Sequence, residues 1–85
     1  MTKVRETYRP VLMAADASEV IGGARLGGFL AATAGTLTVT DFDGTVHVNA
    51  HPVTEGQDVP LPLYFNSLQG GTVTLAGGAS GTLFV

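Results

Sequence analysis

A five-residue phrase, Gly-Thr followed by an aliphatic residue, any residue and a second aliphatic residue, constrains the fold of this chain more than any other feature. It occurs four times, as GTLTV (35–39), GTVHV (44–48), GTVTL (71–75) and GTLFV (81–85). Each copy is a glycine turn followed by alternating apolar and polar side chains, the period of a strand with one buried face. Two copies begin nine residues apart and two begin ten apart, which is the spacing of short strands joined by tight turns. The sequence therefore predicts an all-β fold, a small antiparallel β-sandwich or barrel.

The chain is short and carries few charges. With 85 residues it forms one domain, and a chain of this size buries only about 60 to 65% of its surface on folding. It has no cysteine for a disulfide and no cysteine and histidine pattern for a structural zinc. Charged residues make up 13% of the chain, against about 25% in a typical soluble domain. These features predict stabilisation by partner subunits, in an oligomer or a larger assembly.

The charges are unevenly distributed along the chain. All four basic residues lie in the first 25 positions: Lys3, Arg5, Arg9 and Arg25. The remainder of the chain carries only acidic charge, so it repels phosphate, and we expect no nucleic-acid partner. The basic segment is interpreted either as a contact for an acidic neighbouring protein or as a solvated terminus.

No segment has the pattern of a secretory signal or a membrane helix. The apolar stretch Val11 to Ala15 is too short for a signal core and is closed by Asp16. The chain is uncharged from Val59 onward, but prolines and glycines interrupt it where about 20 apolar residues would be needed. We expect a soluble protein that is made in the cytoplasm.

Two parts of the chain are predicted, an N-terminal arm and linker over residues 1–24 and a single β-sandwich domain over residues 25–85. Residues 1–13 are expected to be an extended arm. After the arm, Asp16 and Glu19 have the spacing of a helix cap, so the linker is either one helical turn or a loop.

The first strand of the predicted domain runs from Arg25 to Thr33. Gly27 and Gly28 within it indicate a bulge or the close approach of another backbone, and Phe29 is its expected apolar anchor.

The first two phrases predict a hairpin. Asp41-Phe42-Asp43-Gly44 suits a type I turn with glycine in the left-handed position after it, and Val46 and Val48 alternate with polar residues beyond the turn. Phe42 at the tip of this hairpin either folds back onto its own sheet or marks a contact with a partner.

The segment from Val59 to Phe65 is predicted to be an edge strand. Pro60 and Pro62 remove backbone donors from one of its sides, which would resist non-specific strand pairing. A polyproline-like loop presented to a partner is the alternative. Because the last phrase ends at Val85, the carboxyl end of the chain is expected to lie within a sheet.

Candidate chemistry is sparse. His47 and His51 would lie about 13 Å apart on a strand, at about 3.3 Å per residue, too far to share a zinc ion. Asp41-x-Asp43-Gly44 begins like a calcium loop but lacks the later ligands. The paired glycines lack the lysine of a phosphate-binding loop, and no serine lies in a nucleophile motif. We expect no catalytic, cofactor-binding or metal-binding residue, and no enzyme activity.

The run from Arg25 to Val85, with GGFLAATAGTLTV, DFDGTVHVNAHPVTEGQDVPLPLYF and GGTVTLAGGASGTLFV, resembles small Gly/Thr-rich virion proteins of tailed bacteriophages. These are encoded beside capsid and tail genes. The resemblance implies a non-enzymatic capsid decoration or cement protein, or the base of a head fibre, commonly a β-sandwich assembled as a trimer. It also implies the virion as location, and the major capsid protein or another virion protein as partner, with no membrane.

Eight residues are the candidates for interface contacts, three from the basic arm and five aromatic anchors that serve the core or the interface. They are Arg5, Tyr8, Arg9, Phe29, Phe42, Tyr64, Phe65 and Phe84. Two alternatives remain open. One is a tail adaptor. The other is a binding module for carbohydrate or a host surface at a fibre tip, for which Phe42, Asp43, His51 and Asn66 would have to gather at one end of the domain.

Overall fold

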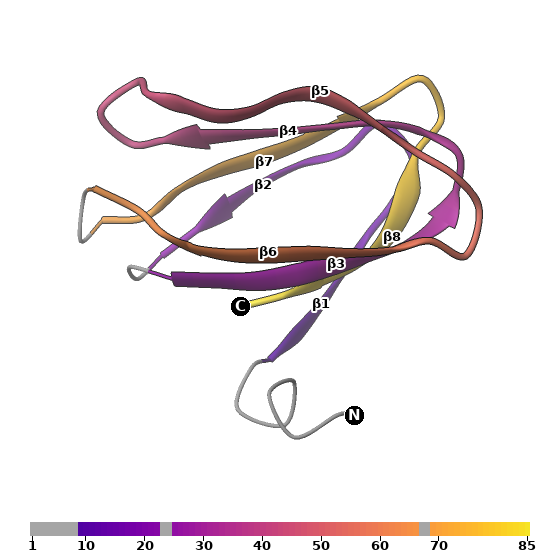
Figure 1. Cartoon of the computed structure of the whole chain (residues 1–85), viewed down its shortest axis with the longest axis horizontal. Helices are drawn as coiled ribbons and strands as arrows, with labels where there is room; N and C mark the ends of the chain where they lie inside the picture. Colours follow the sequence, from indigo (N-terminus) through magenta and orange to yellow (C-terminus); the bar gives the residue numbers. More distant parts are fainter. Residues whose placement is uncertain (1–8, 23–24, 67–68) are drawn as a thin grey trace.

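The computed structural model describes residues 9–22, 25–66 and 69–85, and they form a β-sandwich (Figure 1). Its eight strands are β1 (Pro10–Met13), β2 (Ser18–Ile21), β3 (Arg25–Thr33), β4 (Gly35–Asp41), β5 (Val46–Val53), β6 (Asp58–Tyr64), β7 (Gly71–Ala76) and β8 (Ser80–Phe84). Sheet A has the order β1-β8-β3-β6, sheet B has the order β2-β7-β4-β5, and every pairing is antiparallel. The predicted all-β sandwich is confirmed. The described residues include no helix of the length and hydropathy needed to cross a membrane.

Three of the four Gly-Thr phrases form central strands whose aliphatic residues build the core. In β4, β7 and β8 the aliphatic side chains point between the sheets, and Leu37, Val73 and Leu83 are fully buried. The threonines of β4 and β7 point to the opposite face, where they are half-buried. The alternation seen in the sequence therefore corresponds directly to an inner and an outer face.

The glycines of these phrases serve a purpose that differs from the predicted turns. Gly71 and Gly81 are buried inside strands, and a Cβ at either position would collide with a backbone oxygen of the neighbouring strand. The same Cβ would meet the ring of Phe65 at Gly71 and the ring of Phe29 at Gly81. Glycine is therefore needed there because an aromatic ring packs directly on the backbone.

The remaining phrase, GTVHV (44–48), continues into the edge strand β5 and departs from the expected alternation. The register between β4 and β5 shifts twice beyond Leu37, on both sides of Val39. Val46 is exposed and Val48 is only half-buried, whereas the polar His47 contacts a buried carboxylate. The prediction that Val46 and Val48 share a regular apolar face is wrong, because the register shifts turn this strand relative to its neighbour.

The irregularity predicted at Gly27 and Gly28 is present in β3. The register between β3 and β6 shifts between Leu26 and Gly28. Leu26 and Phe29 are three residues apart, yet both are buried, which a regular strand with a period of two would not allow. Phe29 has no exposed surface and is the expected anchor of this strand.

The sandwich begins earlier than the predicted boundary at Arg25. β1 pairs with β8 in sheet A, and β2 pairs with β7 in sheet B, so each sheet takes an edge strand from the segment that was expected to be arm and linker. Between them Asp16 has a φ of 61°, and its carboxylate accepts a hydrogen bond of 2.8 Å from the Gly78 amide. The loop, one of the two alternatives for this segment, is present over residues 14–17, whereas residues 18–21 are a strand and not a helical turn. Strands of four residues are too short to show a period.

The two predictions for the second half of the chain are confirmed. β6 lies at the edge of sheet A, where β3 is its partner. The carboxyl end of the chain lies inside sheet A, because β8 runs between β1 and β3 and Val85 exchanges two backbone hydrogen bonds with Arg9, of 2.6 and 2.9 Å.

Candidate contact site at the tip of the β4–β5 hairpin

The turn between β4 and β5, residues 41–45, is here called the tip. The Gly44 amide donates to the Asp41 carbonyl over 2.9 Å, and the Asp41 amide donates to the Thr45 carbonyl over 2.7 Å. Gly44 has a φ of 95°, a conformation that only glycine adopts at little cost. The predicted type I turn with a glycine after it is therefore confirmed.

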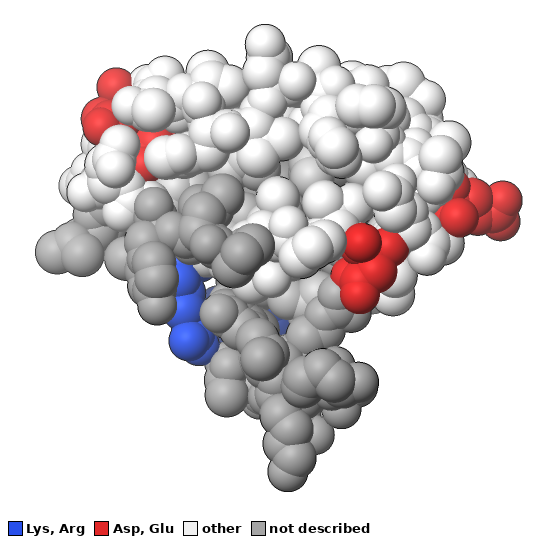
Figure 2. Space-filling view, in the orientation of Figure 1, with Lys and Arg blue, Asp and Glu red and all other residues white. Residues whose placement is uncertain are grey.

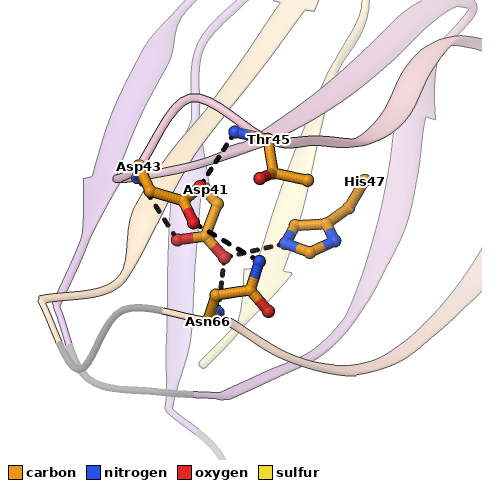
Figure 3. Close-up of polar contacts among 5 residues, drawn as sticks. All are labelled: Asp41, Asp43, Thr45, His47 and Asn66. Carbon is orange, nitrogen blue, oxygen red and sulfur yellow. Dashed lines mark hydrogen bonds and ion pairs between the residues drawn. The ribbon is translucent and has the colours of Figure 1, made fainter.

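The Asp41 side chain is fully buried and connects the tip to two other segments (Figure 3). One carboxylate oxygen accepts a hydrogen bond from the Asn66 amide and lies 2.8 Å from Nε2 of His47. The other oxygen faces the Asp43 amide at 3.5 Å. Asp41, Asp43, His47 and Asn66 are called the Asp41 cluster below. A buried carboxylate that accepts several hydrogen bonds favours one arrangement of the residues around it. Any other arrangement would leave a buried donor without an acceptor.

The Asp41 cluster joins the tip to the loop that follows β6. Besides the contact with Asn66, the Phe42 amide donates to the Gly70 carbonyl over 2.9 Å. The ring of His47 meets the buried ring of Phe65 edge to face, with centroids 5.9 Å apart. These contacts hold the tip against a loop that lies more than twenty residues later in the sequence, so the position of the tip is fixed.

Asp43 forms the outer part of the cluster. Its carboxylate accepts a hydrogen bond of 2.9 Å from the Thr45 amide and lies 3.5 Å from the side-chain amide of Asn66. The hydrogen bonds from the backbone and side chain of Thr45 lower the pKa of Asp43, because they favour the charged carboxylate. Asp43 is therefore ionised on the surface beside Phe42.

Phe42 is the exposed element of this site. Its side chain is 64% exposed. Its two neighbours in the sequence, Asp41 and Asp43, are both held by hydrogen bonds. Of the two interpretations left open by the sequence, the structure excludes that this ring tucks back onto its own sheet. A large apolar side chain on a fixed turn has little conformational freedom left for binding to remove. The entropic cost of binding is therefore small, which favours contact with a partner.

The structure divides the eight candidate residues into groups. Phe29 and Phe65 are buried in the core, so they are not available to a partner. Phe42 is exposed, Arg9 is exposed beside Val85, and Phe84 is half-buried on the outer face of sheet A. Three candidates lie outside what the structure describes: Arg5, Tyr8 and the side chain of Tyr64.

The residues proposed for a binding module gather only in part. Asp43 and Asn66 lie beside the turn that carries Phe42. His51 is opposite Leu37 in the middle of the β4–β5 pairing, away from the tip. The described residues contain no group of three or more histidine, cysteine or acidic side chains that could hold a metal ion.

The pairing of Asp41 with His47 was not predicted from the sequence. A signal was present, because Leu37 and Val39 face inward and the period of two places residue 41 on the same side. An aspartate at an inward position needs a partner, and a histidine six residues later, beyond a tight turn, was within reach. The contact with Asn66 had no comparable signal, since it depends on how the two hairpins pack.

Comparisons of the chain with protein-family models, with curated proteins and with solved structures found no match.

Proposed function

We propose that this protein is a non-enzymatic structural component of a phage particle, which decorates and stabilises the capsid as an oligomer. The observation that carries the proposal is the exposed Phe42 on a tip held by the Asp41 cluster. Such a side chain costs solubility in a free monomer and gains binding energy when a neighbour covers it. The tip is therefore the surface that meets the partner, the capsid shell.

The rest of the surface supports an assembled state. Figure 2 shows one face of the molecule, on which the acidic groups stand apart and most of the described surface between them is uncharged. Among the described residues, five large apolar side chains are exposed: Leu12, Val20, Leu30, Phe42 and Val46. A surface with so few charges and several apolar side chains is better suited to contact with other subunits than to an isolated monomer.

The proposed role is mechanical. Interfaces between the decorating protein and the shell exist only while the shell is intact, so their free energy adds to the work needed to open it. The sandwich suits this role because the described residues hold their buried polar side-chain atoms in hydrogen bonds and their core between two sheets. The resemblance to Gly/Thr-rich virion proteins favours a phage particle over other assemblies, and a trimer over other oligomers.

The test replaces Phe42 and measures occupancy on shells. Shells of the phage that carries the gene, prepared without the protein, are incubated with wild type, Phe42→Ala or Leu12→Ala. Leu12 is 83% exposed on β1 and serves as the control for a general loss of apolar surface. We expect Phe42→Ala to weaken binding by about 2 kcal/mol, roughly 30-fold, because a central aromatic anchor is lost. Equal occupancy for wild type and Phe42→Ala would overturn the role of the tip.

A second candidate function is a binding module for carbohydrate or a host surface, carried on a tail or fibre. The observation that favours it is that Asp43 and Asn66 contact each other at the turn that carries the exposed Phe42, since a sugar site combines polar groups with an aromatic ring. A glycan array with hits that Phe42→Ala abolishes would support this function. An array without hits leaves the structural role, in the capsid or in a tail adaptor.

A further inference from the structure

The four open edges of the sandwich are protected unequally. They belong to β1 and β6 in sheet A and to β2 and β5 in sheet B. The four prolines of the chain all lie in three of these strands: Pro10 in β1, Pro52 in β5, and Pro60 and Pro62 in β6. The exception is β2, which contains no proline. Proline on an edge strand opposes the addition of another strand, and of the four edges in the described residues β2 is the one without a proline.

The hydrogen-bond pattern shows that Pro10 and Pro60 face outward. Arg9 and Val85 exchange both backbone hydrogen bonds, so the next residue, Pro10, directs its backbone away from β8. In the same way the Ala31 amide donates to the Gln57 carbonyl over 2.8 Å, and the alternation along β6 directs Pro60 away from β3. These prolines therefore remove donors from open edges and cost the sheet no internal hydrogen bond.

The same alternation identifies the open groups of β2. The Leu75 amide donates to the Ala17 carbonyl over 2.9 Å, so Glu19, two residues on, directs its backbone toward β7. Ser18 and Val20 direct their amide and carbonyl groups outward. The Val20 side chain is also 75% exposed. β2 therefore offers two residues of free backbone together with an uncovered apolar side chain, the elements by which a sheet edge accepts an added strand.

Glu19 limits what can be added. It lies opposite the fully buried Val73, on the inner face of sheet B, and is half-buried. No hydrogen bond or ion pair joins its carboxylate to another of the described residues. An unneutralised carboxylate on the inner face of an edge strand opposes strand addition unless the incoming strand brings a cation.

This charge also selects against pairing of β2 with a second β2. The antiparallel register that pairs both outward-facing residues of each copy would place Ser18 opposite Val20 of the other copy and Glu19 opposite Glu19. Two carboxylates directly opposite each other on one face destabilise a strand pair. The edge is therefore suited to a different strand, one that carries basic side chains.

We propose that β2 accepts the basic segment Thr2 to Tyr8 of a neighbouring copy as an added antiparallel strand. This rests on the proposed oligomeric state. Lys3 and Arg5 are two residues apart, so in an extended segment both lie on one face, with Val4 on the other. With Arg5 opposite Glu19, Val4 comes opposite the exposed Val20. The register thus neutralises the carboxylate and covers the apolar side chain at once.

The length and symmetry of the exchange are consistent with a closed assembly. Seven extended residues span about 23 Å, at about 3.3 Å per residue, which exceeds the four residues of β2. Each copy donates one segment and accepts one, so the exchange closes either as a reciprocal pair or as a ring of three or more copies. A symmetric β2 to β2 contact is limited to a dimer. The exchange is therefore compatible with the trimer that the resemblance implies.

The absence of cysteine from the chain makes a direct test possible. A Val4→Cys chain is mixed with an equal amount of a Val20→Cys chain and oxidised. Residues opposite each other in the proposed pair have Cα atoms about 5.5 Å apart, within the range for a disulfide. We expect a disulfide-linked pair of the two chains, formed at least tenfold faster than when Val46→Cys, an exposed valine on β5, replaces Val20→Cys. Equal rates, or faster linkage of Val20→Cys chains to each other, would overturn the proposal.

A charge exchange provides the second measurement. Glu19→Arg and Arg5→Glu should each reduce the oligomeric fraction in sedimentation at least tenfold, and the double variant should restore it, because the pair is re-formed with its signs reversed. A double variant that remains dissociated would contradict the proposed register. Both measurements use the isolated protein, whereas the proposed capsid role is tested on shells. A failure of either proposal is therefore distinguishable from a failure of the other.

Discussion

Three copies of the Gly-Thr phrase lie in strands with a neighbour on each side, and the fourth lies in an edge strand. In β4, β7 and β8 the phrase keeps a strict alternation, with aliphatic residues in the core. In β5 the same phrase shifts its register, exposes Val46 and turns His47 toward a buried carboxylate. A change of register in a strand paired on both sides breaks hydrogen bonds to two neighbouring strands. An edge strand has one neighbour, so its register can change where side-chain contacts favour it. The same five-residue pattern thus serves the core in one place and a surface site in the other.

The largest expected effect comes from adding one methyl group to a central copy of the phrase. In Gly81→Ala the new Cβ would collide with the backbone oxygen of Leu30 and the ring of Phe29, neither of which has room to move. We expect a loss of about 3 kcal/mol in the free energy of unfolding, the upper range for overpacking a core. Urea denaturation measures it.

Gly44→Ala is the matched change in the edge copy. Nothing lies within 4 Å of a Cβ there, so the cost is that of the left-handed backbone alone, about 1 kcal/mol. A Gly44→Ala variant that loses as much stability as Gly81→Ala would show that the two environments do not differ in this way.

The Asp41 cluster should give the next largest effect. Asp41→Ala removes the acceptor for the Asn66 amide and the partner of His47. We expect a loss of about 2 kcal/mol, since hydrogen bonds to a buried charge are lost, and faster hydrogen exchange at the Asn66 amide. Asp43→Ala, on the exposed side of the same turn, should change stability much less than Asp41→Ala does. If the two variants were equally stable, the cluster would not be what fixes the tip.

The smallest effect concerns the pH dependence of the tip. The folded pKa of Asp43 lies below its ordinary value of 3.8, so its contribution to stability is complete above that value and is lost as the pH falls through the folded pKa. NMR titration of the Asp43 carboxyl should give a lower midpoint in the folded protein than in a peptide of residues 40–46. Coinciding midpoints would indicate that Thr45 does not hold this carboxylate in solution.

The fold class and most strands were predictable because the phrase repeats and its period is strict. The tip was predictable for the same kind of reason, since Asp41 and Gly44 have strong turn preferences. β1 and β2 were not, because four-residue strands carry no readable period and are defined by the strands beside them. The role of Gly71 and Gly81 was also hidden, since it depends on aromatic rings that reach them from other parts of the chain.

Only part of the candidate site could be predicted from the sequence. Phe42 was identified as conspicuous, but its exposure depends on a fixed turn that the Asp41 cluster joins to the loop after β6. His51, which the sequence grouped with Phe42, lies elsewhere on β5, because distance along a hairpin strand separates residues in space as well. The surface site depends on how two loops pack against each other, and no local sequence pattern encodes that packing.

The most direct test of the proposed function is whether phage particles contain the protein, in how many copies and at which position. Mass spectrometry of purified particles gives the number of copies, and cryo-electron microscopy gives their position. We predict hundreds of copies on the capsid surface, with Phe42 against the shell. A few copies at a single vertex would assign the protein to the tail or its adaptor, and its absence from particles would contradict the proposed function.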